Sequence, residues 1–347
     1  MLTTDFERVS LRTEHPFTIA RETIHEIENV IVRVEDEDGH VGLGGAAPSR
    51  RYGETIDTVA AVLPALLEAV EEIGDPHSLQ RIERAMDAVV HHNPAAKAAV
   101  DIALHDLVAT RADLPLYRYW GLDPSDTVTS SFTIAIDSLE HMAEKTADAV
   151  AAGYSILKVK LGTDHDEAIV RTVREHAPDA TIRVDANEAW TPPEAVRKSR
   201  MLADYDVEFV EQPLPADHHE GLKHVYERSA LPLALDESCA RLADMPHVAT
   251  RADIANLKLM KCGGLRETRR MIHAARAHGL EVMLGCMIES NASIAAAAHL
   301  APLLDYADLD GSLLLAEDPY AGVDLPEGQV DLEGLDRTGT GAQRRQS

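Results

Sequence analysis

Charged residues recur in this chain at an almost constant interval, each within or at the end of a short apolar run. The series is Lys160, Asp185, Glu211, Asp236, Lys258 and Asp310, with steps of 25, 26, 25 and 22 residues and then 52, which is two units. A charge in an apolar run is costly unless it is paired or bound to a metal. Three consecutive carboxylates offer hard oxygen ligands that suit Mg²⁺ better than zinc. Asp185, Glu211 and Asp236 are therefore predicted to bind one Mg²⁺ ion.

Two lysines flank the acidic triplet, Lys160 one unit before it and Lys258 one unit after it. In the simplest interpretation they are counter-ions for the carboxylates. The alternative is a chemical role for both lysines at the metal site.

An alternation of short apolar runs and longer amphipathic segments positions these residues from about residue 130 onward. It is typical of a parallel sheet with crossover helices. Eight strands are predicted, at residues 131–136, 155–162, 181–187, 207–213, 231–237, 254–260, 280–287 and 305–311. Eight such units form a (β/α)-barrel, in which the carboxyl ends of the strands meet at one mouth. The charged series should gather there.

The N-terminal third has a different pattern. Residues 6–46 read as strands, and helical patterns follow after Thr55. Pro94 suits the first turn of a helix that runs to about Thr110, and apolar residues lie around most of its circumference. This helix is predicted to be largely buried.

Several short motifs resemble the muconate-lactonising-enzyme subgroup of the enolase superfamily. They occur in the family's order along the barrel, and AAKAAVDIALHDL is similar to the end of that family's capping domain. The barrel motifs are the KxK pair of Lys158 and Lys160, VDANEAW at Asp185, VEQPL at Glu211, LDES at Asp236 and NLKLMKCGG at Lys258.

The resemblance implies an α/β protein, a (β/α)-barrel of the enolase type with an α+β capping domain. The cap would comprise residues 1–125 and the barrel residues 126–315. Residues 316–347 would return to the cap and end in a loose polar tail from about Asp336. The cap would close over the barrel mouth.

The run ADLDG, with Asp308 and Asp310, resembles the DxD pair with which dipeptide epimerases hold the ammonium group of a dipeptide. Alternate residues of a strand point the same way, so both carboxylates can face the mouth. The other interpretation is a strand-end turn with solvated acids. Arg21, in PFTIAR, lies near where such epimerases carry an arginine for a glutamate side chain, although an arginine on an exposed strand is usually just solvated. Lys158 would donate to the substrate carboxylate.

The function implied by the resemblance is a Mg²⁺-dependent dipeptide epimerase. It would remove and return the α-proton of the C-terminal residue of L-Ala-D/L-Glu or a related dipeptide, through an enediolate intermediate. Lys160 and Lys258 would face that carbon from opposite sides, one removing a proton and the other returning one. The same metal site and lysines serve N-acylamino-acid racemases, o-succinylbenzoate synthases and cycloisomerases, none of which needs a seat for an ammonium group. A metal-stabilised barrel that only binds a ligand is a remote alternative, because both lysines are retained.

Composition limits the partners and the compartment. The net charge of −26 would repel nucleic acid and anionic membranes. No apolar run approaches the roughly 20 residues of a membrane span, and the first ten residues are charged where a secretory signal would be apolar. The three cysteines form no CxxC pair and suit reduced thiols. We therefore expect a cytoplasmic enzyme with a small-molecule substrate; a homo-oligomer remains open.

Overall fold

An eight-stranded parallel sheet forms the centre of the molecule, a computed structural model that describes residues 1–346. The strands pair in chain order, and Ser131 N donates to Ala307 O at 3.0 Å, which brings the first and last strands together as a barrel. The strands are β4 (Phe132–Ile134), β5 (Ile156–Lys160), β6 (Thr181–Asp185), β7 (Val207–Glu211), β8 (Leu233–Leu235), β9 (Ile254–Lys258), β10 (Glu281–Gly285) and β11 (Tyr306–Asp308).

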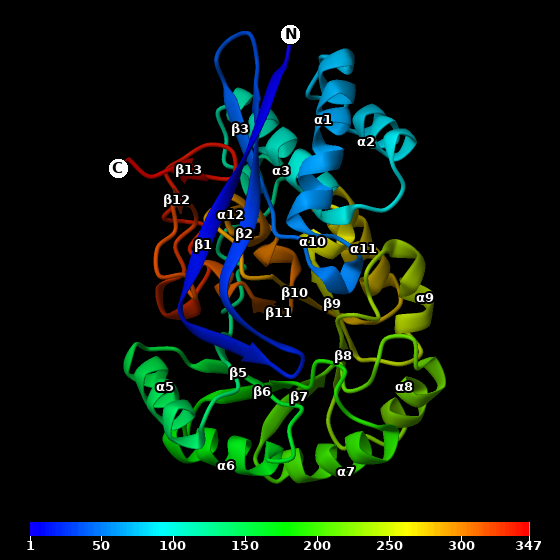
Figure 1. Ribbon diagram of the computed structural model, residues 1–347, viewed down its shortest axis with the longest axis vertical. Coiled ribbons are helices and arrows are strands. Elements are labelled where there is room, and N and C mark those ends of the chain that lie inside the picture. Colours follow the sequence, from blue (N-terminus) through cyan, green and yellow to red (C-terminus); the bar gives the residue numbers. More distant parts are fainter. Residues whose placement is uncertain (347) are drawn as a thin grey trace.

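The barrel and its eight strands confirm the sequence prediction, and each strand lies inside its predicted range. The ranges extend two or three residues past the carboxyl end of each strand, because the loops at the mouth begin with apolar or small residues such as Cys286 and Met287. Helices follow the strands and surround the barrel (Figure 1). They are α5 (Leu139–Ala151), α6 (Asp166–His176), α7 (Pro192–Ala203), α8 (His219–Tyr226), α9 (Met245–Val248), α10 (Leu259–Cys262), α11 (Leu265–Ala277) and α12 (Asn291–Ala298).

A separate antiparallel sheet packs against helices to form the cap. Its strands are β1 (Thr3–Ile19), β2 (Glu22–Glu35) and β3 (Val41–Ala46), and its helices are α1 (Ile56–Ile73), α2 (Leu79–Val89), α3 (Pro94–Arg111) and α4 (Leu116–Tyr119). Helix α3 is buried along almost its whole length, as its sequence predicted. Strand β3 approaches it so closely that a Cβ atom at Gly44 would lie 2.1 Å from Ala99 O. Glycine is therefore required where the two elements touch.

The long β1–β2 hairpin joins the cap to the barrel mouth. The hairpin begins in the cap, near the N-terminus, and its turn lies beside the barrel strands (Figure 1). Thr18 O accepts a hydrogen bond from Ile136 N, in the loop after β4, at 2.9 Å. A Cβ atom at Gly162, in the loop after β5, would lie 2.8 Å from the Cβ atom of Ala20. The turn therefore rests on the barrel loops.

The C-terminal segment returns to the cap and differs from the loose tail expected after about Asp336. Leu116 N donates to Gly339 O at 2.7 Å, and Thr340 is fully buried with its hydroxyl 3.0 Å from an Asp106 oxygen. Short strands β12 (Tyr320–Ala321) and β13 (Gln343–Arg344) then pair. The polar composition of the tail hides these contacts because they use backbone groups. Within residues 1–346, no helix combines the length and apolar character of a membrane span.

Candidate active site

The charged residues of the periodic series gather at one end of the barrel. Lys160, Asp185, Glu211 and Lys258 are the last residues of their strands, and Asp236 follows β8 directly. Lys160 pairs in register with Asp185, and Asp185 with Glu211. Parallel strands in register bring their carboxyl ends to one level. The sequence interval is thus translated into a ring of charges at the mouth.

Lys158, two residues before Lys160 on β5, has no exposed surface, and the same is true of Asp185 and Glu211. Its Nζ lies 2.6 Å from Asp308 Oδ2, 2.8 Å from Glu211 Oε2 and 3.6 Å from Asp185 Oδ2. Burial acts to lower the pKa of Lys158, but the three carboxylates outweigh it and raise that pKa well above its usual value. Lys158 is therefore a permanent cation that links the acidic triplet to the ADLDG motif.

The two lysines of the series are ion-paired on opposite sides of the triplet. Lys160 Nζ lies 2.7 Å from Asp185 Oδ2, and Lys258 Nζ lies 2.7 Å from Asp236 Oδ2. Burial acts to lower the pKa of Lys258, but the Asp236 carboxylate acts to raise it, and the net result is a pKa above the usual value. Strands β5 and β9 are four positions apart in a ring of eight, so the two lysines face each other across the mouth.

Lys261 fixes the position of Asp236 through hydrogen bonds. Its Nζ donates to Asp236 Oδ1 at 2.5 Å, to Asp236 O at 2.6 Å and to Asn256 O at 2.7 Å. The side chain of Lys261 has no exposed surface, so all three ammonium protons are used inside the protein. Burial works against ionisation of Asp236, but Lys258 and Lys261 hold its pKa well below the usual range. Sequence reasoning missed Lys261, although it lies three residues after Lys258 in the same motif.

The two acids of ADLDG form an unequal pair beside this ring. Asp308 accepts from Ser131 Oγ at 2.6 Å as well as from Lys158, and Asp310 Oδ2 accepts from Thr133 N at 2.7 Å. Burial raises the pKa of Asp310 to about 7, and the nearby Asp308 carboxylate adds to the shift. Burial also acts to raise the pKa of Asp308, but Lys158 outweighs it and holds the value at about 2. A cation placed between them would favour the ionised form of both.

Unsatisfied oxygen atoms at the mouth test whether a divalent cation fits. Asn187 Oδ1 and Asn256 Oδ1 are buried and accept no hydrogen bond from any of residues 1–346, whereas Glu211 Oε2 faces the Lys158 ammonium group at 2.8 Å. Asn187 and Asn256 are themselves bound to the triplet, donating to Asp185 at 3.1 Å and to Glu211 at 2.9 Å. Carboxylate and amide oxygens from the adjacent strands β6 to β9 are hard ligands that fit Mg²⁺. The triplet is not gathered into a tight cluster, since lysine ammonium groups lie against its oxygens.

Another acidic group lies far from the mouth, in the turn between β2 and β3. Asp36, Asp38 and His40 have ligand atoms within 4.8 Å of one another, the one such group of three in residues 1–346. Asp36 Oδ1 accepts from the backbone nitrogens of Asp38 and His40 at 3.0 and 2.9 Å. Its oxygens are therefore used by the turn itself, and we assign no metal to it.

Arg21 lies at the tip of the β1–β2 hairpin and points into the mouth from the cap side. Its guanidinium group donates to Glu237 Oε1 at 2.9 Å and to Glu188 Oε2 at 2.8 Å. Glu188 is also bound by Arg51, at 2.6 and 2.7 Å. Burial raises the pKa of Glu237 to about 7, and Asp236 adds to the shift. Glu237 had not been predicted as a site residue, although it directly follows Asp236 in LDES.

The mouth encloses a cavity of about 850 Å³, lined by Lys160, Asp236, Lys258, Asp308, Asp310 and residues of the β1–β2 hairpin. Tyr52 also lines it, with its hydroxyl 3.5 Å from Asp236 Oδ1. A volume of this size accommodates a small organic substrate. Five of the predicted barrel residues and Arg21 from the cap thus line one space. The other three, Lys158, Asp185 and Glu211, are fully buried and do not line it.

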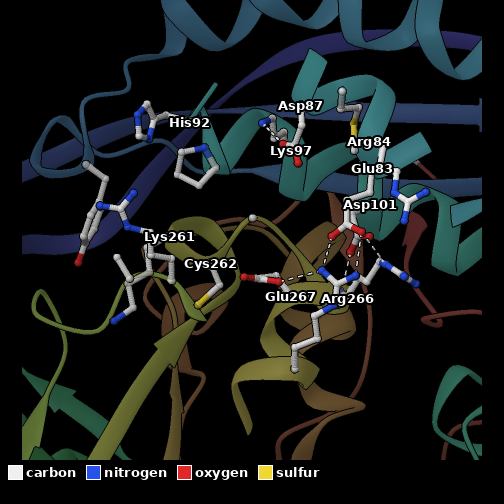
Figure 2. Close-up of a pocket in the computed structure, with 17 residues that line it drawn as sticks. Glu83, Arg84, Asp87, His92, Lys97, Asp101, Lys261, Cys262, Arg266 and Glu267 are labelled. Carbon is white, nitrogen blue, oxygen red and sulfur yellow. Dashed lines mark hydrogen bonds and ion pairs between the residues drawn. The ribbon is translucent and has the colours of Figure 1, made fainter. Parts of the chain in front are cut away.

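A second cavity of about 590 Å³ lies between the cap helices and α11 (Figure 2). Tyr52 lines both cavities. Its charged side chains pair mostly with each other. Lys97 pairs with Asp87 at 2.5 Å within the cap, and Arg266 of α11 pairs with Glu83 of α2 at 2.9 Å across the domain junction. Lys261 lines this cavity but directs its ammonium group to Asp236. We interpret the second cavity as part of the junction between cap and barrel.

Family comparisons agree with this fold and site. Residues 3–121 match the model of the mandelate racemase / muconate lactonizing enzyme N-terminal domain, and residues 141–341 match that of the enolase C-terminal domain-like family. The chain therefore belongs to the mandelate racemase / muconate lactonizing enzyme family of enolase-like proteins.

Several relatives within this family are named as dipeptide epimerases. The chain is 38% identical to an L-Ala-D/L-Glu epimerase of Bacteroides thetaiotaomicron over 94% of this chain and 84% of that one. It is similar to the crystal structure of a dipeptide epimerase from Enterococcus faecalis V583 with Mg and L-Leu-L-Tyr, with a TM-score of 0.93, 36% identity and coverage of 98% and 99%. A dipeptide epimerase from Methylococcus capsulatus with Mg and L-Arg-D-Lys gives a TM-score of 0.90, 35% identity and 98% coverage of both chains.

Proposed function

We propose that this chain is a Mg²⁺-dependent dipeptide epimerase that inverts the α-carbon of the C-terminal residue of L-Ala-D/L-Glu or a related dipeptide. The observation that carries the proposal is the position of Lys160 and Lys258 across one mouth, with the carboxylate triplet between them. Relatives of the same fold with Mg and a dipeptide bound support it.

The two lysines would exchange protons with opposite faces of the α-carbon. A lysine removes a proton only in its neutral form, and the protonated partner returns one to the other face. Asp236 keeps Lys258 protonated in the present arrangement, which suits the donor role for one direction of the reaction. Reversal of the two roles would epimerise the other isomer. Water is restricted because the hairpin tip rests on the barrel loops.

Asp185, Glu211 and Asp236 would hold Mg²⁺, assisted by the unsatisfied oxygens near them. When bound, the ion acts as a Lewis acid toward the substrate carboxylate, where negative charge develops. Lys158 contributes a fixed positive charge at the same place, because three carboxylates keep it protonated. Lys261 keeps Asp236 oriented toward the mouth.

Asp308 and Asp310 would seat the dipeptide ammonium group. The pair is buried, and one member carries a raised pKa, so a cationic partner relieves an existing repulsion. This feature favours a dipeptide over the substrates of N-acylamino-acid racemases, o-succinylbenzoate synthases and cycloisomerases, which carry no ammonium group. The two lysines on opposite sides of the triplet favour catalysis over a barrel that merely binds a ligand.

The test is deuterium incorporation from D₂O into a library of free dipeptides, followed by proton NMR with Mg²⁺ and again with EDTA. We expect loss of the α-proton signal of the second residue only with Mg²⁺, together with appearance of the epimer. Exchange of N-acylated amino acids with no exchange of any free dipeptide would replace the proposal by the racemase alternative.

The cellular setting is also a proposal. Three unpaired cysteines, two of them buried, support a reducing compartment such as the cytoplasm. A homo-oligomer remains to be tested, and light scattering of the purified enzyme would measure its mass directly.

A further inference from the structure

The cap side of the mouth carries charges that the reaction itself does not use. If Asp308 and Asp310 hold the ammonium group and the triplet lies at the carboxylate end, the dipeptide spans the mouth from β11 toward β6–β8. The side chain of its second residue then leaves toward the cap above β6–β8. Arg21 lies there, since its guanidinium contacts Asn187 O at 3.3 Å and Glu237.

The arginines at this end are already neutralised. Arg21 is paired with Glu237 and Glu188, and Arg51 is paired with Glu188 through two hydrogen bonds. Two guanidinium groups therefore face two carboxylates that come from the barrel itself. A substrate carboxylate could reach Arg21 only by displacing one of them.

The remaining charges on the cap side are mostly acidic. Glu22, Glu26 and Glu28 alternate along β2 and line the mouth cavity, so they share one side of the strand. None of the three has an ion-pair partner anywhere in the described part of the chain, and Glu26 accepts a hydrogen bond only from Ser10 Oγ. Arg50 is the one basic residue lining this cavity from the cap that forms no ion pair within residues 1–346.

We infer that the subsite for the second side chain selects against anionic residues and favours cationic ones, with Glu22 as the main determinant. The inference rests on the proposed function and narrows its substrate class to a related dipeptide with a cationic second residue, in place of L-Ala-D/L-Glu. Glu22 is next to Arg21 at the hairpin tip, pairs in register with Ile19 and is exposed toward the cavity. Glu22, Glu26 and Glu28 form an acidic rim on the cap side of the cavity. Such a rim raises the local concentration of cations and repels anions. Arg21 acts as a clamp between cap and barrel.

The experiment uses three dipeptides that differ only in the second side chain, L-Ala-L-Lys, L-Ala-L-Gln and L-Ala-L-Glu, with kcat/KM measured by deuterium exchange in Mg²⁺. We expect the order Lys, Gln, Glu, with a ratio of at least about tenfold between the first and the last. The ratio should shrink when KCl rises from about 0.1 M to about 1 M, because the screening length falls from about 10 Å to about 3 Å.

Two variants distinguish the effect of the rim charge on the Lys-to-Glu ratio from the effect of the net charge of the whole protein. Glu22→Gln should lower the Lys-to-Glu ratio several-fold. Glu68→Gln makes the same change in net charge on an exposed position of α1, about 18 Å along the helix from its mouth end, and should leave the ratio unchanged. An unchanged ratio in Glu22→Gln would overturn the assignment of Glu22.

Arg21→Met distinguishes the clamp from a substrate ligand. As a clamp, Arg21 affects all three dipeptides by a similar factor, and thermal unfolding of the variant reports the lost ion pairs. A higher kcat/KM for L-Ala-L-Glu than for L-Ala-L-Gln in the wild type, lost selectively in Arg21→Met, would overturn the inference. No exchange with any of the three dipeptides would instead count against the proposed function.

Discussion

Replacement of Asp310 by asparagine should make the free enzyme more stable at neutral pH while removing its activity on dipeptides. Asp310 is buried beside Asp308, and its pKa is raised to about 7 from an ordinary value near 3.9. Because the folded pKa is the higher one, the folded state binds the proton more tightly than the unfolded state. This contribution to stability is complete below about pH 4 and is lost as pH rises to about 7.

The magnitude follows from the size of the shift. Three pKa units at 1.36 kcal/mol each give an upper limit of about 4 kcal/mol over the whole range, of which about 2 kcal/mol lies between pH 5.5 and pH 7. The amide of Asp310→Asn does not titrate, so the variant escapes this loss. Its advantage in free energy of unfolding over the wild type should grow by about 2 kcal/mol across that interval and then level off.

Urea unfolding of both proteins without added ligand, followed by circular dichroism at several pH values from about 5.5 to about 8.5, measures this difference. Asp148→Asn is the matched control, because Asp148 is an exposed residue of α5 that forms no ion pair within residues 1–346. A difference between Asp310→Asn and wild type that does not change with pH would refute the reasoning. The same variant should lose about 10² to 10⁴ in kcat/KM for free dipeptides, since a buried ion pair worth about 3–5 kcal/mol is broken.

Other consequences of the site can be tested directly. Lys160→Ala and Lys258→Ala should each abolish epimerisation but retain exchange of the α-proton of one epimer with D₂O; full epimerase activity would remove that lysine from the mechanism. N-acetylation of a good dipeptide should reduce kcat/KM severely, because it leaves Asp308 and Asp310 without their cationic partner. Lys261→Met should weaken Mg²⁺ binding by about 10- to 100-fold in calorimetry, because Asp236 loses the group that orients it; unaltered affinity would show that Lys261 has only a structural role.

The barrel half of the site could be predicted from sequence because local rules fix it. A residue at the end of a parallel strand lies at the mouth whatever its neighbours are, so a regular interval along the chain was enough to group Lys160, Asp185 and Lys258. The partners of these side chains could not be predicted in the same way. Lys261 reaches Asp236 only because the chain turns into α10 directly after β9.

The cap half of the site depends on contacts that no interval reveals. Arg21 meets Glu237 across 216 positions of sequence, and Thr340 packs on Asp106 across 234. Such pairs form only when the cap docks on the barrel, and neither residue carries a local signal of its partner. The expectation for Arg21 therefore rested on resemblance alone, and the structure adds the two carboxylates that face it.

The residues proposed for proton transfer lie on the barrel strands, whereas the residues proposed for side-chain selectivity lie on the cap. The lysines and the carboxylate triplet are fixed by strand register in a closed sheet, so they move little when the cap changes. The hairpin tip is held by a few contacts, among them the backbone hydrogen bond of Thr18 O and the ion pairs of Arg21, which a single substitution removes. Substitutions in the tip can therefore alter which side chain is accepted while the proton-transfer geometry below it stays intact. For that reason the dipeptide series tests the cap, whereas the lysine variants test the barrel.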